Sequence, residues 1–136
     1  MPAEYRYARR VQFHETDLAG IVHFSWYFKY MEEAEHALWR SVGMSIVPPG
    51  HDFGLPRVNA NIDFKAPLKF EDEFEVVVTI EKVSRSSISY RHAIVKGETV
   101  IAEGTMTAVH VDKKPGEPLK SAPIPQDIVD ALRSQA

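Results

Sequence analysis

Cysteine is absent from the 136-residue sequence, which excludes disulfides, thiolate catalysis and cysteine-ligated zinc. A large charge excess is also lacking, since the formal net charge of -3 argues against broad electrostatic binding to nucleic acid. No stretch approaches the ~18 apolar residues of a membrane span, and the first ten residues, MPAEYRYARR, lack the apolar core of a secretory signal. We therefore expect one cytoplasmic domain over residues 1–136 that binds neither nucleic acid nor membrane.

Periodicity predicts a strand and then a helix in the first third of the chain. Alternation over residues 5–13 predicts a first strand, and the small and polar residues of 14–24 predict a connection. Apolar residues at steps of three and four then predict a helix over about 25–42. Ser25 is expected to be its N-cap, and Gly43 lies where a helix commonly ends in a left-handed residue.

The remaining two thirds of the chain have the character of an antiparallel meander. Prolines and glycines predict a loop over 44–56 and an irregular crossing over 113–125, followed by a short helix over 126–133. Between the loop and the crossing we expect four strands, at about 57–66, 72–83, 86–96 and 99–112. Their short connections favour antiparallel neighbours, so the pattern indicates an α+β fold in which the helix covers one face of the sheet.

The connection before the long helix carries a recognisable motif. Its matching residues are Thr16, Asp17, Ala19, Gly20, Ile21, Val22 and Tyr27. This stretch resembles the signature of the 4-hydroxybenzoyl-CoA thioesterase-like branch of the hotdog-fold acyl-CoA thioesterases. The resemblance continues through Tyr27, Glu32 and Ala34 on the helix and through DFKAPLKFED at 63–72. It implies a five-stranded antiparallel curved sheet wrapped around one long central helix, with a short C-terminal helix.

The chain departs from this family pattern at one informative position. Many relatives carry Tyr-His directly after the Gly-Val-Val, whereas this chain has His23-Phe24. A side-chain role for histidine therefore cannot be carried over to Phe24. The resemblance instead implies that the backbone N–H of Phe24 is an oxyanion donor at the start of the helix.

Asp17 is the expected catalytic carboxylate. Thioester hydrolysis needs a nucleophile or an activated water, together with a donor for the charge that develops on the carbonyl oxygen. Asp17 can attack the carbonyl directly or take a proton from water, and the sequence leaves both routes open. The alternative is that Asp17 only caps a turn. His23 is expected to bind substrate, assist proton transfer or orient Asp17, although a satisfied histidine at the helix entrance is an equal alternative.

Several further residues are expected to contact substrate. Gly20, Val22 and Tyr27 of the motif are expected to bind substrate, and the alternative for Tyr27 is a place in the core. The resemblance keeps the helix carboxylate Glu32 as a minor candidate, because some hotdog thioesterases use a helix glutamate, and the alternative is a solvated or ion-paired carboxylate. Two more groups of candidates are the strand pair Asn59 and Asn61, and the turn Arg85, Ser86 and Ser87. The two asparagines share a strand face, where they either line a pocket or bond only to neighbouring backbone. The turn resembles the family's nucleotide-contacting turn.

Metal and cofactor chemistry are not expected. His14, Glu15 and His23 lie on a strand end and a loop, which give no fixed ligand spacing. The resemblance implies an acyl-CoA substrate and a homodimer or homotetramer with sites at the subunit interface. Two alternatives stay open: a non-catalytic module that binds acyl thioesters, and a thioesterase whose carrier is acyl carrier protein. The helix-borne His and acid pattern of hotdog dehydratases is not matched.

Overall fold

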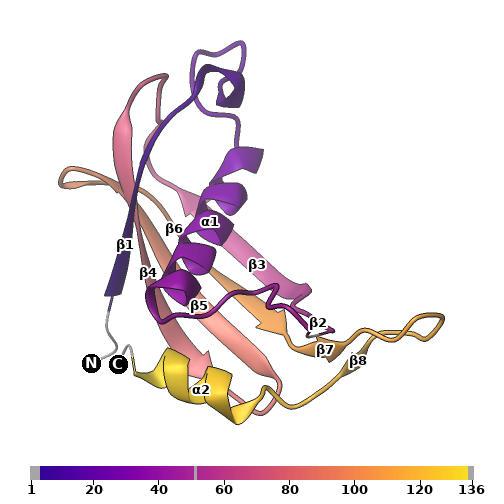
Figure 1. Ribbon diagram of the computed structural model, residues 1–136. Coiled ribbons are helices and arrows are strands. Elements are labelled where there is room, and N and C mark those ends of the chain that lie inside the picture. The colour runs from indigo at the N-terminus through magenta and orange to yellow at the C-terminus, as the bar shows by residue number, and fades with distance from the viewer. Residues whose placement is uncertain (1–3, 51, 135–136) are drawn as a thin grey trace.

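Five strands form one antiparallel sheet in the computed structural model, which describes residues 4–50 and 52–134. The strand order is β1-β4-β5-β6-β3, so β1 and β3 form the two edges (Figure 1). The strands are β1 (Glu4–Arg10), β3 (Arg57–Phe64), β4 (Glu73–Val83), β5 (Ser87–Lys96) and β6 (Thr99–Val109). The predicted meander is confirmed for β4, β5 and β6, which pair in sequence order through short turns. The expectation that the strand at 57–66 would neighbour the next strand was wrong, because β3 pairs with β6 and β1 takes the place beside β4.

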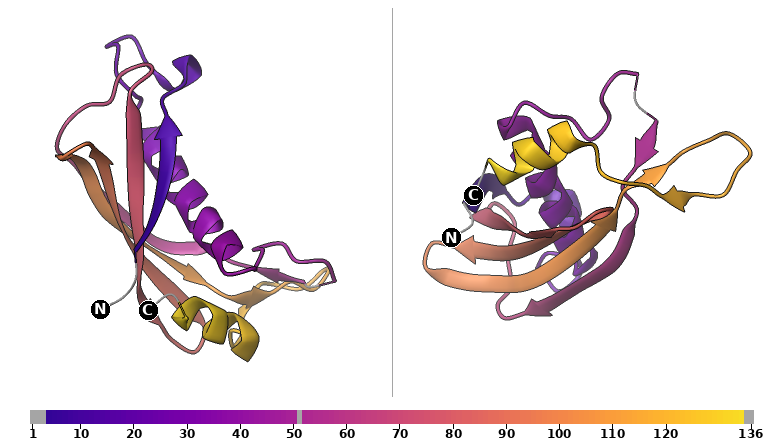
Figure 2. Two further views of the ribbon diagram at one scale, coloured as in Figure 1. Left: turned by 60° about the vertical axis from the view of Figure 1, so that its left-hand side comes forward. Right: turned by 90° about the horizontal axis from the view of Figure 1, so that it is seen from below.

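The long helix α1 (Ser25–Ser41) lies in the hollow of the curved sheet, as the view from below in Figure 2 shows. Its buried side chains recur at the predicted steps of three and four, and include Tyr27, Tyr30, Met31, Ala34 and Leu38. The second helix α2 (Gln126–Arg133) begins directly after Pro125, as predicted. The expected hotdog arrangement is therefore confirmed. Neither helix of the described chain combines the length and apolar character needed to cross a bilayer.

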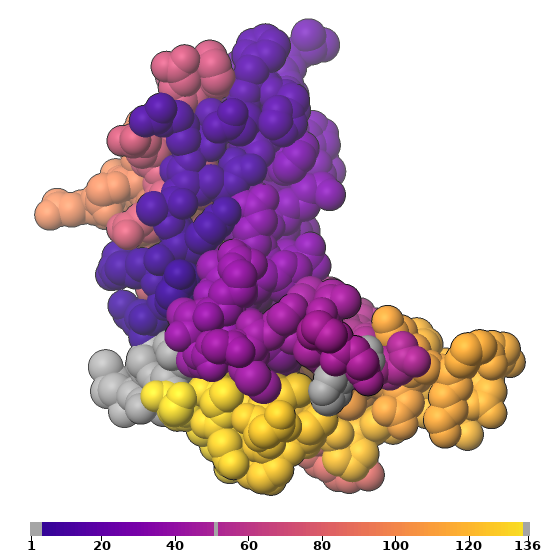
Figure 3. Space-filling model, viewed as in Figure 1, coloured from indigo at the N-terminus to yellow at the C-terminus, as the bar shows by residue number. Residues whose placement is uncertain are grey.

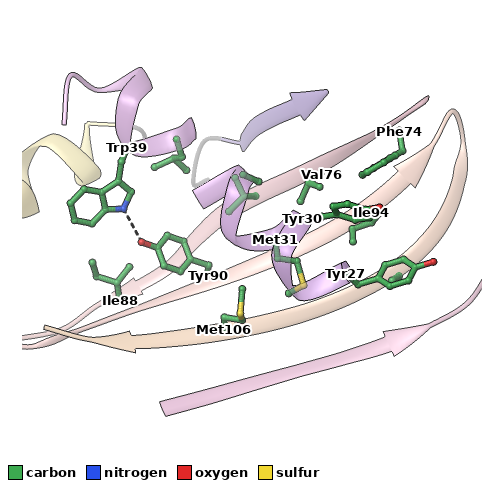
Figure 4. Close-up of a cluster of buried hydrophobic side chains, with 14 of the residues drawn as sticks. Tyr27, Tyr30, Met31, Trp39, Phe74, Val76, Ile88, Tyr90, Ile94 and Met106 are labelled. Atoms are coloured by element: carbon green, nitrogen blue, oxygen red, sulfur yellow. Dashed lines mark hydrogen bonds between the residues drawn. The ribbon is translucent and has the colours of Figure 1, made fainter. Parts of the chain in front are cut away.

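The core joins the helix to the inner face of the sheet (Figure 4). Trp39, from the last part of α1, is 1% exposed and its indole N–H donates to the Tyr90 hydroxyl of β5 at 2.9 Å. A buried indole or phenol needs such a partner, because an unpaired polar group inside the protein costs free energy. This bond therefore lets two large aromatic side chains fill the core and fixes α1 against the sheet.

The first strand ends earlier than predicted, at Arg10 rather than Phe13. Residues Phe13–Glu15 form a short 3-10 helix, η1, because the Gln12 N–H donates to the Glu15 carboxylate at 2.8 Å and so caps the turn. Glu15 is fully buried by this turn. The prediction of a continuous strand through residue 13 was wrong because it did not allow for this local capping.

Three short strands replace parts of the predicted loop, last strand and crossing. They are β2 (Phe53–Gly54), β7 (Val111–Asp112) and β8 (Lys120–Ser121), and they form a second small sheet in the order β2-β7-β8. The predicted strand over 99–112 is interrupted at His110, whose N–H donates to the Ser86 carbonyl at 2.7 Å. This bond turns the chain toward the small sheet.

One carboxylate of the helix is buried inside the protein. Glu35 is 1% exposed and pairs with Arg57 at the start of β3, and one of its oxygens lies 2.8 Å from Nε2 of His92 on β5. A buried charge is tolerated when it is paired in this way. The cluster ties the middle of α1 to both an edge strand and a central strand.

Gly104 is required where β3 and α1 approach β6. A Cβ at this position would lie 2.3 Å from the backbone oxygen of Asn61 and 3.1 Å from Cε of Met31. The first distance is shorter than van der Waals contact and involves backbone, so a side chain here would push β3 away from β6. Glycine thus sets the spacing of the edge strand that faces the N-terminal half of α1.

Substituting Gly104→Ala should lower the free energy of unfolding by about 2 kcal/mol or more, because the added methyl overpacks this junction. Gly54→Ala is the matched control, since its Cβ would meet only side-chain atoms at 3.4 Å or farther. The control should change stability by less than about 0.5 kcal/mol. Denaturant unfolding of both variants measures the difference, and equal stability of the two would contradict the assigned role of Gly104.

Candidate active site

Asp17 lies in a tight turn between η1 and α1, at the end of the molecule opposite α2 (Figures 1 and 3). The turn is closed by two backbone hydrogen bonds of 2.9 Å, from the Asp17 N–H to the Ile21 carbonyl and from the Gly20 N–H to the Asp17 carbonyl. Gly20 has a φ of +79°, a left-handed conformation that favours glycine. The sequence Asp-Leu-Ala-Gly therefore folds locally into a turn that presents the Asp17 side chain.

The Asp17 carboxylate is only half used by this turn. Its Oδ1 accepts the Ala19 N–H at 2.8 Å, which is the capping role that the sequence left as an alternative. Its Oδ2 has no hydrogen-bond partner among residues 4–50 and 52–134. One oxygen thus fixes the carboxylate and the other is free to act on a bound molecule.

The start of α1 has no side-chain cap. The prediction that Ser25 is the N-cap was wrong, because the helix begins at Ser25 and Phe24 occupies the cap position in a helical conformation. His23 partly substitutes, since its Nδ1 accepts the Ser25 N–H at 3.3 Å and lies 2.8 Å from the Ser25 Oγ. The Phe24 N–H has no partner within the described chain. This free N–H adds to the positive end of the helix dipole.

A cavity of about 510 Å³ brings the carboxylate and the helix start together. Its walls come from the turn and from the chain that follows β3, and are formed by Asp17, Ile21, Val22, Phe24, Tyr27, Phe64, Lys65, Ala66 and Pro67. Of the residues expected from the sequence, Asp17, Val22, Phe24 and Tyr27 therefore meet at one cavity. Gly20 shapes the turn beside it, and the His23 ring stacks against Phe24 with ring centroids 4.6 Å apart.

The far wall of this cavity was not predicted as part of the site. Lys65 and Ala66 both donate their backbone N–H to the Ile101 carbonyl, at 2.8 and 3.1 Å. The Val22 N–H donates to the Leu68 carbonyl at 2.8 Å, so the turn and the 64–67 segment are joined by backbone. The sequence signal was the DFKAPLKFED motif, which pointed to the family but gave no reason to place this segment against Asp17.

Tyr27 is a buried residue with a phenol group that lines the same cavity as Asp17. Burial raises its pKa, the negative charge of Asp17 raises it further, and a hydrogen bond with the Leu68 backbone opposes the change. The ring also packs edge-on against Phe64, with centroids 5.1 Å apart. Tyr27 therefore stays protonated at neutral pH and contributes a largely aromatic surface.

The other expected substrate contacts lie away from the Asp17 cavity of the same chain. Glu32 is exposed on α1, with an oxygen 3.5 Å from Arg57. Asn61 and Asn59 lie on the outward face of β3, where the Asn61 amide donates to Asn59 at 3.1 Å and to Thr105 at 2.7 Å.

The Arg85-Ser86-Ser87 turn joins β4 to β5 at the end of the sheet near α2, far from the Asp17 turn (Figure 1). Its backbone is occupied, since the Arg85 carbonyl accepts the Ile124 N–H at 2.9 Å. The Arg85 side chain is exposed. One chain therefore does not bring this turn, Glu32 or the two asparagines to the Asp17 cavity.

Comparison with known proteins places these features in a family. Residues 11–132 match the model of the Thioesterase-like superfamily. A protein of Aquifex aeolicus with a provisional esterase name is 38% identical over 135 residues, which cover 98% of this chain and 99% of that protein.

Solved structures agree with the sequence comparison. A 1,4-dihydroxy-2-naphthoyl-CoA thioesterase from Synechocystis has a TM-score of 0.85 and 29% identity, and the match covers 95% of each chain. A gentisyl-coenzyme A thioesterase has a TM-score of 0.81 and 32% identity, over 93% of this chain and 98% of that one.

Proposed function

Because the chain belongs to the Thioesterase-like superfamily, we propose that it hydrolyses an acyl-CoA thioester to a free acid and coenzyme A in the Asp17 cavity. One observation supports this assignment above the others: Asp17, whose carboxylate is half free, and Phe24, whose N–H has no partner in the described chain, line the same cavity. A thioester needs an attacking group and a donor for its carbonyl oxygen, and these two residues supply them.

The chemistry at the carbonyl follows from this pairing. The thioester oxygen accepts the Phe24 N–H, and the positive end of the α1 dipole stabilises the negative charge that develops there. On the first route an Asp17 oxygen bonds to the carbonyl carbon, the C–S bond breaks and the thiolate leaves, and water then hydrolyses the mixed anhydride. On the second route Asp17 takes a proton from a water that attacks the carbonyl carbon, the C–S bond breaks, and the proton passes to the departing thiolate.

His23 is proposed to assist at the entrance of this site. Its ring is exposed and its Nδ1 is already directed at the Ser25 N–H, so Nε2 is the nitrogen available to substrate or to the departing thiol. This arrangement agrees with binding or proton transfer rather than with a direct hold on Asp17, to which no hydrogen bond from His23 exists in the described chain.

For the acyl group we propose a hydroxylated aromatic acid. The two structural relatives are named as thioesterases for 1,4-dihydroxy-2-naphthoyl-CoA and gentisyl-coenzyme A. Phe24, Tyr27 and Phe64 give the cavity an aromatic lining on which a flat ring packs well. A long aliphatic chain makes less use of such a lining.

A second copy of the chain is proposed to complete the site. Within the described residues β3 pairs only with β6, which leaves its other edge unpaired. This strand and the nearby turns expose large apolar side chains, among them Val58 and Phe64 at 63% and 51%. Edge-to-edge pairing through β3 in a homodimer or homotetramer covers these groups. It also brings Glu32, Asn59 and Asn61 of one chain toward the Asp17 cavity of its partner.

The coenzyme end of the substrate is proposed to contact Arg85, Ser86 and Ser87 of another subunit. The exposed guanidinium of Arg85 suits a phosphate, which it can bind through two parallel N–H groups. This contact would select coenzyme A as the acyl carrier. A thioesterase for acyl carrier protein would instead bind its carrier through a basic surface patch.

Asp17→Asn should lower turnover by at least about 100-fold on the best substrate from a panel of aromatic and aliphatic acyl-CoAs, because the amide neither attacks nor accepts a proton. Thiol release measures the rate. Asp127→Asn, the same change at an exposed position on α2, is the control and should keep the parental rate. If Asp17→Asn turns over as fast as the parent, Asp17 is excluded as the catalyst. If the parent binds acyl-CoA with micromolar affinity but hydrolyses none of the panel, the non-catalytic module is favoured.

The unpaired β3 edge predicts that the protein sediments as two or four chains at micromolar concentration. Val58→Lys places a charge on this edge and should shift the distribution toward single chains. Analytical ultracentrifugation of the parent and the variant tests this, with Val47→Lys, an exposed apolar residue outside β3, as the control. A parent that sediments as one chain would contradict the proposed assembly.

A further inference from the structure

The Glu15 carboxylate is a buried charge next to the active-site turn that the proposed reaction does not use. Its side chain is fully buried, and four donors converge on its two oxygens. Arg9 on β1 donates to both oxygens, at 2.8 and 2.6 Å, in the parallel geometry that guanidinium and carboxylate favour. The Tyr30 hydroxyl of α1 and the Gln12 N–H each donate to Oε1 at 2.8 Å.

These contacts connect three elements through one side chain. Arg9 comes from β1, Tyr30 from the second turn of α1, and Gln12 from the segment before η1. The Arg9 guanidinium also lies 4.6 Å from the centre of the Tyr30 ring, a cation–π contact that closes the group. Glu15 therefore has one fixed position relative to both β1 and α1.

Glu15 is joined by its backbone to both reactive groups. Its carbonyl accepts the His23 N–H at 2.9 Å, and His23 is the residue directly before Phe24. Asp17 follows Glu15 by two residues along the chain. The residue between them, Thr16, forms an antiparallel backbone bridge with Val22. Asp17 and the Phe24 N–H thus lie on the two arms of one loop, and Glu15 holds the base of that loop.

Glu15 itself is not a proton donor or nucleophile for the reaction. Burial alone would raise its pKa, but hydrogen bonds from Arg9, Gln12 and Tyr30 keep the pKa below the ordinary value of 4.5. The carboxylate is therefore charged at neutral pH, and both of its oxygens accept hydrogen bonds within the protein. It also does not border the Asp17 cavity.

We propose that Glu15, held by Arg9 and Tyr30, is a positioning residue that fixes the Asp17 carboxylate relative to the Phe24 N–H. This inference rests on the proposed thioesterase function, in which the two groups act on one carbonyl. Their separation must be held closely, because small misplacements of catalytic groups are costly to the rate. The clamp supplies that constraint from residues outside the cavity.

The chain offers a matched control at the same arginine. Glu33 on α1 also accepts from Arg9, at 2.7 Å, and from the Tyr7 hydroxyl at 3.0 Å. Glu15→Gln and Glu33→Gln therefore make the same isosteric change at two carboxylates that share Arg9. Only Glu15 is attached to the Asp17 loop.

Glu15→Gln should lower kcat by about 10-fold to 100-fold while KM changes by less than about threefold, and Glu33→Gln should keep kcat within about twofold. In an Asp17→Asn background Glu15→Gln should alter the residual turnover by less than about twofold, because it acts through Asp17. Tyr30→Phe, which removes one of the four donors with little change in volume, should lower kcat by about threefold to tenfold. It serves as the test if Glu15→Gln does not fold.

Equal loss of kcat in Glu15→Gln and Glu33→Gln would overturn the proposal, as would an undiminished effect in the Asp17→Asn background. Amide hydrogen exchange gives a readout that needs no turnover. The His23 amide should exchange at least about tenfold faster in Glu15→Gln than in the parent or in Glu33→Gln. If the parent hydrolyses no thioester, the proposed function fails, and exchange alone decides: faster exchange supports Glu15 as the residue that fixes the loop, and unchanged exchange rejects it.

Discussion

The uncapped start of helix α1 is the constraint on which the rest of the site depends. A helix begins with N–H groups that lack partners, and most helices satisfy one of them with a serine, threonine or acid at the N-cap. Here Phe24 occupies that position and offers no such side chain. The free N–H and the positive end of the dipole are thereby left for a bound molecule. The Asp17 turn lines the same cavity as Phe24, so under the proposed function it places a carboxylate beside the bound thioester.

The sheet and helix could be predicted from the sequence because their signals are local. Alternation in β4 and the steps of three and four in α1 report directly which side chains face the core. The left-handed Gly43 after α1 and the start of α2 at Pro125 follow from backbone preferences of single residues. The motif at 16–27 likewise located Asp17 and Phe24.

The buried charges could not be predicted, because their partners lie far away in the sequence. Glu35 is enclosed by Arg57 on β3 and by His92 on β5, and neither partner is near it in the sequence. The sequence places Glu15 at a strand end without fixed metal-ligand spacing, and its burial depends on Arg9 and Tyr30. Residue type alone indicates exposure for a carboxylate, and only the assembled fold supplies the compensating donors.

The separation between the Asp17 cavity and the other expected substrate contacts has a consequence for assembly. Glu32 and the Arg85 turn lie elsewhere on the chain, and the edge strand β3 is open. Under the proposed function, a single chain holds both reactive groups, and a second chain brings the groups expected to select the acyl and coenzyme parts. Specificity and catalysis would then be divided between subunits.

The most direct test of this account is a crystal structure of the protein with a non-hydrolysable thioether analogue of an aromatic acyl-CoA that retains the carbonyl. The account predicts the carbonyl oxygen at about 2.7–3.1 Å from the Phe24 nitrogen, with the carbonyl carbon facing Oδ2 of Asp17. A carbonyl bound away from the start of α1, or one approached by a different carboxylate, would contradict it.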